Sequence, residues 1–280
     1  MAKLLSKDGK FYMRDGKLLG YTPPPKASVT PQTGIIYTSG LSGIDPATLT
    51  ILSKAMSNNT DITNTTTTVY VDYDDIHRKI EIGDQVAIDL NGTNYAFDVI
   101  GFNHDTLTDA NSYGNATTTG KAGITFQMHD LFATTYMMNS SNTNVGGWKS
   151  SAMRTSTMPL MKGYLPAEWQ TAIKLVNKVS GTGGGSSSGT ETVSDSCFLL
   201  AEIEIFGSTI QSVSGEGTQY AYYKAGNSKV KNRSGSFGAW WERSPHSGGS
   251  YFFCGVDSGD SSATYLGAKY KYGVAFGFCV

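Results

Sequence analysis

The sequence predicts an α+β fold with two helices beside a mainly antiparallel sheet. Two runs that alternate apolar and polar residues, 80–88 and 95–102, flank Asn91-Gly92, which is a strong hairpin signal. Residues 166–179 place their apolar side chains on one face of a helix. Because the expected strands and helices do not alternate regularly, the order favours an α+β fold over a parallel α/β fold.

Residues 1–68 are expected to form a small N-terminal appendage that attaches or docks the protein. Residues 11–19 read as a short hairpin with Asp-Gly at its turn. A helix is expected at residues 45–56, with Asp45 as its cap and Pro46 at its first position. An Asn/Thr-rich polar run then leads into the main domain.

Residues 69–280 are expected to form that main domain. A first helix is expected within residues 147–161, ahead of the clearer one at 166–179. A Gly/Ser-rich flexible loop follows at 181–189. Besides the hairpin, short apolar runs predict strands at residues 123–127, 197–206 and 273–280.

Composition excludes some classes of partner. Charged residues make up 16% of the chain, the net charge is −1, and no basic run stands out, so nucleic acid is not an expected partner. No stretch is apolar enough to span a bilayer, and the N-terminus lacks a secretory apolar region. The expected location is a virus particle assembled inside the host, or the cytoplasm before assembly. The chain has only three cysteines, and such a small and odd number argues against a disulfide framework.

Catalytic and metal-binding patterns are absent from the sequence. The four histidines are scattered, and neither a zinc-ligand spacing nor a phosphate-binding loop is recognisable. Aspartates cluster at residues 72–75 and 257–260, but neither cluster has the spacing of a calcium loop, and both read as solvated loops. The sequence therefore predicts no enzyme activity, no metal and no cofactor.

The C-terminal tail carries the most informative pattern. Residues 240–245 read Trp-Trp-Glu-Arg-Ser-Pro, and residues 273–280 read Gly-Val-Ala-Phe-Gly-Phe-Cys-Val. The segment between them is dense in Gly, Ser, Asp and aromatic residues. Tyr and Phe give rigid contact area, while Ser, Gly and Asp give adaptable hydrogen bonding, a combination typical of a binding surface.

These two blocks resemble the C-terminus of C-type-lectin-like domains found in phage and gut-bacterial proteins. Blocks at residues 82–84, 97–101, 147–154 and 165–166 match the same family in order, so the resemblance covers roughly residues 69–280. Some members are variable proteins of diversity-generating retroelements, which copy a template repeat into the 3′ end of the gene and mutate it at adenines. The resemblance implies a C-type-lectin-like fold that displays a hypervariable ligand-binding surface.

The residue types of the tail fit adenine mutagenesis. Mutated Asn codons end in a pyrimidine and cannot encode Trp, Met, Gln, Glu or Lys. These five types account for 43 of the 280 residues, yet none occurs from Ser244 to Ala268. Asn itself is absent after Asn232, as expected if template asparagines were mutated away. Lys269 and Lys271 fall outside the permitted set and are expected to be constant or to derive from another template codon.

Ligand binding is therefore expected in a variable region at about residues 239–272. The residues expected to contact ligand are Ala239, His246, Ser247, Gly248, Ser250, Tyr251, Phe253, Cys254, Asp257, Ser258, Asp260, Tyr265, Tyr270 and Tyr272. The residues expected to form its framework are Trp240, Trp241, Arg243, Phe276 and Phe278. Arg243 is expected to pair with a carboxylate or with backbone carbonyls.

Three functions compete. The first is a retroelement-diversified receptor-binding protein of a phage tail, whose partner is a protein or glycan receptor on a bacterial surface. The second is a lectin of fixed specificity, although the Glu-Pro-Asn and Trp-Asn-Asp motifs of calcium-dependent lectins are missing. The third is a relative of formylglycine-generating enzymes, which use a cysteine pair that Cys254 and Cys279 would have to supply. The sequence is compatible with either a monomer or a homo-oligomer.

Overall fold

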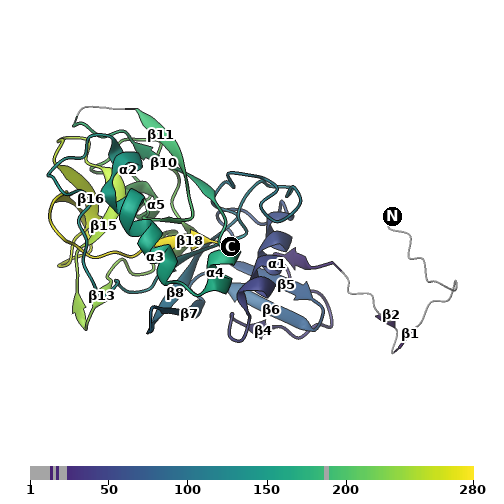
Figure 1. The fold of residues 1–280 in the computed structure, drawn as a ribbon. Helices are drawn as coiled ribbons and strands as arrows, with labels where there is room; N and C mark the ends of the chain where they lie inside the picture. The colour runs from purple at the N-terminus through teal and green to yellow at the C-terminus, as the bar shows by residue number, and fades with distance from the viewer. Residues whose placement is uncertain (1–12, 15–16, 19–23, 186–188) are drawn as a thin grey trace.

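The computed structural model describes residues 13–14, 17–18 and 24–280, apart from 186–188 (Figure 1). Strands outnumber helices, and they lie in several separate sheets. Between the named strands, the pairing is antiparallel everywhere except between β4 (Thr38–Ser39) and β6 (Ile76–Glu81). The predicted α+β class is confirmed.

A five-stranded antiparallel sheet lies in the middle of the molecule. Its order is β12-β18-β9-β8-β7, so β18, the last of the described strands along the chain, lies inside the sheet between β12 and β9. Apolar side chains from distant segments meet there: the rings of Phe97 and Phe278 lie 5.3 Å apart, and those of Phe126 and Phe278 lie 5.5 Å apart. The strands are β7 (Gln85–Leu90), β8 (Thr93–Phe102), β9 (Ile124–Met128), β12 (Cys197–Phe198) and β18 (Gly277–Cys279).

The predicted hairpin in this sheet is confirmed. Asn91 and Gly92 both have positive φ, 54° and 89°, as a two-residue turn between twisted strands requires. The first strand is shorter than expected, because Ile80 and Glu81 belong to β6 of another sheet. The strand expected at residues 123–127 is also confirmed as β9.

The N-terminal segment shares the core of the main domain. Its helix α1 (Pro46–Ser57) begins as predicted, with Asp45 accepting hydrogen bonds from the N–H groups of Ala47 and Thr48. The hydroxyl of Ser53 donates to the carbonyl of Val280. Strands β3 (Lys26–Ser28) and β4 pair with β5 (Thr68–Tyr73) and β6. The boundary expected at residue 68 is therefore wrong: it cuts through one sheet and one hydrophobic core.

The earlier hairpin expectation falls partly outside the described residues. β1 (Met13–Arg14) and β2 (Lys17–Leu18) pair antiparallel, as a hairpin at residues 11–19 requires. The predicted turn, Asp15-Gly16, lies outside the described residues.

The two predicted helices are shorter and more broken than expected. The first divides into α2 (Gly147–Ser150), a π-helix (Met153–Thr157) and α3 (Met158–Tyr164). The second, α4 (Ala167–Ala172), ends well before residue 179, because Val176–Gly181 pairs as strand β10 with β11 (Thr190–Asp195). Sheet pairing here overrides the helical periodicity of the sequence.

The strand predicted for the most apolar run, residues 197–206, is wrong over most of its length. Of the strand expected at residues 197–206, only Cys197 and Phe198 form β12. Glu202–Phe206 forms helix α5, and the side chain of Glu204 accepts from the N–H of Ala201, the residue before the helix. The run is buried almost throughout, and a short buried helix cannot be distinguished from a buried strand by periodicity alone.

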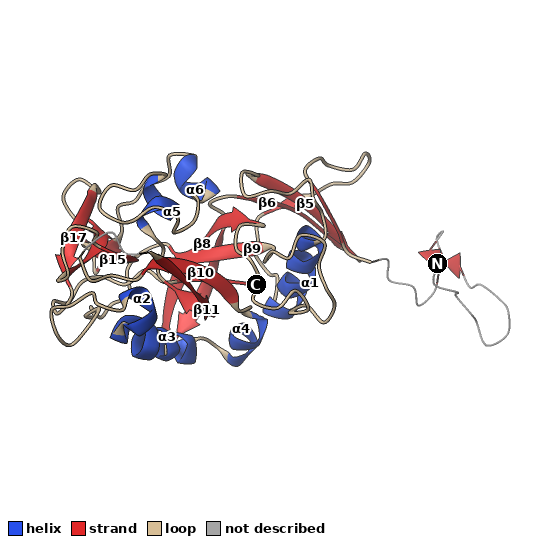
Figure 2. Cartoon of the chain, turned by 90° about the horizontal axis from the view of Figure 1, so that it is seen from above, coloured by secondary structure: helices blue, strands red, loops and turns tan. Residues whose placement is uncertain are grey.

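Helices lie on both sides of the strands. Figure 2 shows α2, α3 and α4 on one side and α5 and α6 (Ala221–Lys224) on the other. A three-stranded antiparallel sheet, β15 (Trp240–Pro245), β16 (Phe252–Val256) and β17 (Ala263–Gly267), lies at the end opposite β5 and β6 (Figures 1 and 2). The short ladder β13 (Asn232–Arg233) and β14 (Ser236–Phe237) precedes it. Within the described part of the chain, no helix combines the length and the apolarity needed to cross a membrane.

Candidate functional site

The two blocks of the tail, residues 240–245 and 273–280, form a buried frame. Trp240, Trp241, Arg243, Phe276 and Phe278 are each no more than 1% exposed. The indole of Trp241 donates to the carbonyl of Tyr136 at 2.8 Å, and that of Trp240 donates to the carbonyl of Lys229 at 3.1 Å. The expectation that these five residues form the framework agrees with their burial.

Arg243 anchors this frame through a buried ion pair. Its guanidinium donates to both carboxylate oxygens of Glu204, at 2.5 and 2.9 Å, and to the carbonyls of Val179, Leu199 and Glu216. Burial opposes ionisation of Glu204, but Arg243 and Lys178 hold the pKa of its carboxyl below the usual value. Both partners predicted for Arg243, a carboxylate and backbone carbonyls, are present.

Four aromatic side chains gather on the outer part of the C-terminal sheet. The ring of Tyr265 lies 4.6 Å from that of His246 and 5.0 Å from that of Phe252. Tyr251 meets Phe252 edge-on at 6.4 Å. Burial lowers the pKa of His246, so its ring is neutral at pH 7 and stacks as an aromatic group. We call His246, Tyr251, Phe252 and Tyr265 the aromatic surface.

Three tyrosines of this region have about half of their surface exposed to solvent. Tyr251 is 57% exposed, Tyr265 is 48% exposed and Tyr270 is 55% exposed. The ammonium group of Lys269 lies 5.4 Å from the centre of the Tyr270 ring. Exposed aromatic side chains that lie close together are characteristic of contact surfaces.

Asn144 holds the loop that carries the aromatic surface. This side chain is fully buried and donates to the carbonyls of His246, Gly249 and Phe252 at 2.7–3.2 Å. Its own N–H donates to the carbonyl of Ser250 at 2.7 Å. The side chain and backbone of Asn144 together therefore bond four carbonyls of residues 246–252. Sequence reasoning missed Asn144, because it lies in a polar loop about 100 positions away.

The Gly-rich loop supports the same segment from the other side. Gly184 donates its N–H to the Oδ1 of Asn144 at 2.9 Å. Gly185 has φ +79°, and a Cβ there would lie 2.7 Å from the backbone nitrogen of Ser250. The described residues of the predicted flexible loop thus pack against the tail, and glycine is needed for that close approach.

A second support runs through Ser247. Its N–H and its hydroxyl both donate to the carbonyl of Gln211 at 2.8 Å. The segment containing Gln211 is held in turn by Glu202, whose carboxylate accepts from the N–H groups of Ile210, Gln211 and Ser212. Nothing in the sequence near the tail indicates that Glu202 supports this loop.

The turn between β16 and β17 is stabilised by its own aspartates. Asp257 accepts from the N–H of Gly259, and Asp260 accepts from the N–H of Ser262. Hydrogen bonds from the Ser262 hydroxyl and N–H lower the pKa of Asp260. Ser258 at the tip is exposed. These residues face solvent, as expected of contact residues.

Two predicted contact residues are not at the surface. Phe253 and Cys254 are each 0% exposed, and the thiol pKa of Cys254 is raised well above its usual value by burial. The prediction that they contact ligand is corrected: they belong to the core beneath the surface. Phe252, which was not among the predicted contacts, is the partly exposed aromatic residue of this strand.

The other predicted contacts keep some exposure. Tyr272 is half-buried, with its ring edge-on to Trp241 at 5.1 Å, so much of it belongs to the frame. The remaining predicted residues that are partly or fully exposed are Ala239, His246, Ser247, Gly248, Ser250, Asp257, Ser258 and Asp260.

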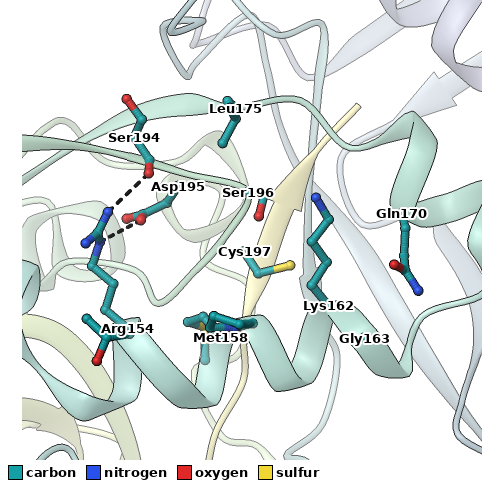
Figure 3. A pocket seen from close by; sticks show the side chains of 12 residues that line it. Arg154, Met158, Lys162, Gly163, Gln170, Leu175, Ser194, Asp195, Ser196 and Cys197 are labelled. Carbon is teal, nitrogen blue, oxygen red and sulfur yellow. Dashed lines mark hydrogen bonds and ion pairs between the residues drawn. The ribbon is translucent and has the colours of Figure 1, made fainter.

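A polar groove of about 480 Å³ opens elsewhere, beside α3 and the end of β11 (Figure 3). Arg154 in this groove donates to Asp195 at 2.7 Å and to the carbonyl of Ser194 at 3.2 Å. Burial raises the pKa of the Cys197 thiol to about 12, so this group is not a thiolate at neutral pH. Its lining residues include neither histidine nor glutamate, and we assign no chemistry to it.

The cysteines and histidines occupy separate surroundings. Cys279 contacts Thr125 and Asp105, whereas Cys254 lies beside Glu202 and Glu242. His77 pairs with Asp72 and His129 pairs with Asp98. Among the described residues, the group able to surround a metal ion is Glu202, Glu242 and Cys254, whose ligand atoms lie within 4.8 Å of one another. No local motif in the sequence indicates this group, since Glu202 lies 40 or more positions before Glu242 and Cys254.

Residues 122–280 match the family described as "Domain of unknown function (DUF6273)". This match covers more than half of the chain. The chain belongs to the DUF6273 family. The DUF6273 segment contains the whole C-terminal sheet and the residues that support it, Asn144, Glu202 and Gln211. No curated protein and no solved structure matched the chain.

Proposed function

We propose that this DUF6273 protein is a binding protein whose ligand contacts the aromatic surface and the neighbouring loops of residues 246–272. The carrying observation is the clamp by Asn144, which bonds the carbonyls of His246, Gly249 and Phe252 and so fixes the loop that carries the exposed Tyr251. We further propose a C-type-lectin-like arrangement for residues 69–280, in keeping with the resemblance of the tail blocks.

The physical basis is preorganisation. A loop whose carbonyls are already bonded to Asn144 loses little conformational entropy when a partner binds. Tyr and Phe side chains have few rotatable bonds, so they provide contact area at low entropic cost. The partner that we propose is a protein or glycan receptor on a bacterial surface, contacted by a phage tail.

A binding experiment tests this assignment. The variant Tyr251→Ser, Phe252→Ser, Tyr265→Ser and Tyr270→Ser removes the aromatic contact area. Its binding to whole bacterial cells and to a glycan array is compared with that of the unmodified protein. We expect a loss of at least about 100-fold in affinity, since central aromatic residues dominate interfaces.

A matched control comes from β14. Phe237 is 64% exposed and lies outside the variable region, so Phe237→Ser should bind like the unmodified protein. Retained binding in the four-residue variant would contradict the proposal. One narrow glycan preference, unchanged among natural isolates, would favour the fixed-specificity lectin.

Diversification by a retroelement is the second part of the proposal. It predicts a near-copy of the final coding segment beside a reverse-transcriptase gene, differing only where the copy has adenine. We also expect the differences between the gene and its copy to fall in codons of exposed residues, because random substitution in a core destabilises the fold. We expect constant codons at the buried positions 253–256 and 266–268. A locus with neither gene nor copy would refute diversification while leaving the binding proposal to the cell assay.

A further inference from the structure

Three potential ligands for a cation meet beneath the aromatic surface. Glu242 comes from β15, Cys254 from β16, and Glu202 from the first position of α5. Their ligand atoms lie within 4.8 Å of one another, and all three residues are buried. The exposed fractions of Glu202 and Glu242 are both 0%.

Nearby cations are already engaged by other acids. The guanidinium of Arg243 pairs with Glu204 at 2.5 Å, and the ammonium of Lys178 pairs with Asp105 at 2.7 Å. Lys178 also contacts Glu204 at 2.8 Å. These two cations therefore balance two carboxylates, and they leave the charges of Glu202 and Glu242 without a counterion.

Glu202 is satisfied by hydrogen bonds. It accepts from three backbone N–H groups and from the hydroxyl of Ser212, and most of these bonds reach Oε2. Its Oε1 accepts from the N–H of Gln211 alone and retains capacity for a further ligand. The carboxylate can therefore contribute one oxygen without losing the loop that it holds.

Glu242 has no partner for either carboxylate oxygen among the described residues. A buried carboxylate without a partner is strongly unfavourable. Protonation would remove the charge, and burial does raise the pKa of Glu242 well above its usual value. Protonation would still leave the second carboxyl oxygen of Glu242 without a donor, since no donor among the described residues reaches either oxygen. A cation at this point would satisfy both oxygens.

We infer that Glu242, Cys254 and Glu202 bind one divalent metal ion of the zinc class under the C-terminal sheet. A thiolate combined with carboxylate oxygens suits Zn²⁺, whereas Ca²⁺ and Mg²⁺ prefer oxygen ligands alone. Cys254 releases its thiol proton to solvent when it binds the metal. The ion would link β15, β16 and α5. Glu202 also holds Gln211, which in turn accepts hydrogen bonds from Ser247 in the loop of the aromatic surface.

Metal content provides the direct test. The full-length protein is purified without chelator, and its zinc is measured by mass spectrometry. We expect about one ion per chain, and less than about a tenth of that in Cys254→Ser and in Glu242→Gln. Cys197→Ser is the matched control, because Cys197 is a buried cysteine outside the group. The control should keep its metal.

Cobalt substitution reports the sulfur ligand itself. Co²⁺ added to metal-free protein should give a sulfur-to-cobalt charge-transfer band that Cys254→Ser lacks and Cys197→Ser retains. Failure of the unmodified protein to hold zinc or to take up Co²⁺ would overturn the inference. Equal metal content in all variants would overturn it as well.

The unfolding temperature of Glu242→Gln distinguishes metal binding from simple protonation of Glu242. If Glu242 is only a buried acid, Glu242→Gln removes a costly group, and the unfolding temperature stays level or rises. If Glu242 binds metal, the same variant unfolds at a lower temperature, and a chelator lowers the unfolding temperature of the unmodified protein but not of the variant. These readouts do not depend on the ligand of the aromatic surface.

Discussion

At the scale of single residues, the most consequential side chains near the tail are polar and buried. Asn144 bonds three carbonyls of residues 246–252, and Arg243 bonds a carboxylate and three carbonyls. Groups of this kind contribute little net stability while they are paired, but their removal leaves the partners unsatisfied. Their substitution should therefore have larger effects than substitution of the exposed tyrosines above them.

Replacement of Asn144 tests this point. Asn144→Ala removes the donor to the carbonyls of His246 and Gly249 and the acceptor of the Gly184 N–H, whereas the carbonyl of Phe252 keeps the N–H of His246. We expect a loss of about 3 kcal/mol in the free energy of unfolding. Urea denaturation measures it. Asn142→Ala is the matched control, because that side chain accepts a single long bond of 3.4 Å from the N–H of Lys269. Equal stability of the two variants would show that the clamp is unimportant.

Lys231 gives the protein a distinctive dependence on pH. Its ammonium group is fully buried and donates to the carbonyls of Met128 and His129. Burial lowers its pKa from 10.5 to about 8. The folded state therefore loses this proton at a lower pH than the unfolded state does, so the lysine contributes increasing stability as the pH rises from about 8 to 10.5.

The pH prediction is measured as a difference between two proteins. From pH 7 to pH 9.5 the unmodified protein should gain about 2 kcal/mol relative to Lys231→Met. The buried cysteines and tyrosines, whose pKa values are raised, are common to both proteins and cancel. Parallel stability curves for the two proteins would show that Lys231 keeps an ordinary pKa.

At the scale of elements, β16 and β17 divide into buried and exposed positions without simple alternation. In β16 only Phe252 retains exposure, and residues 253–256 are all buried. In β17 the exposed residue is Tyr265, which lies next to the buried Leu266. Packing on both faces of β16 explains why neighbouring residues are buried together. A variable surface on this sheet is therefore confined to its loops and to single strand positions.

A pair of substitutions tests this division. Phe253→Ser empties a fully buried site and should cost at least about 3–5 kcal/mol of unfolding free energy. Tyr265→Ser at an exposed site should change it by no more than about 1 kcal/mol. Denaturant midpoints measured on the two variants decide the matter. A large loss for Tyr265→Ser would place that residue in the core of the fold.

At the scale of the whole molecule, residues 26–57 share one hydrophobic core with the main domain, which predicts one folding unit. Leu49, Leu52 and Met56 of α1 are at most 1% exposed. The amide of Asn103 donates to the carbonyls of Met56 and Ile62, which fastens the end of α1 to β8. The three-stranded sheet β15-β16-β17 lies at the end of the molecule opposite α1, β5 and β6 (Figure 1).

Truncation tests the single unit. Loss of Leu49, Leu52 and Met56 alone removes roughly 5–9 kcal/mol of apolar burial, which is comparable to the whole stability of a domain, about 5–15 kcal/mol. We therefore expect a fragment of residues 69–280 to show no cooperative thermal transition by circular dichroism, whereas residues 24–280 should unfold cooperatively. A cooperative transition in the shorter fragment would restore the boundary at residue 68.

Local signals in the sequence determined several elements by themselves. The Asn91-Gly92 turn, the Asp45 cap of α1 and the short strand β9 depend on backbone geometry that nearby residues set. The residue types of the tail predict a binding surface, and this stays a prediction for the binding experiment. Tertiary structure decided the rest: that Val176 begins a strand, that Phe253 and Cys254 are buried, and that Asn144 and Glu242 lie beneath the surface. These outcomes depend on contacts between residues distant in the chain, whose packing and hydrogen bonding outweigh local preference.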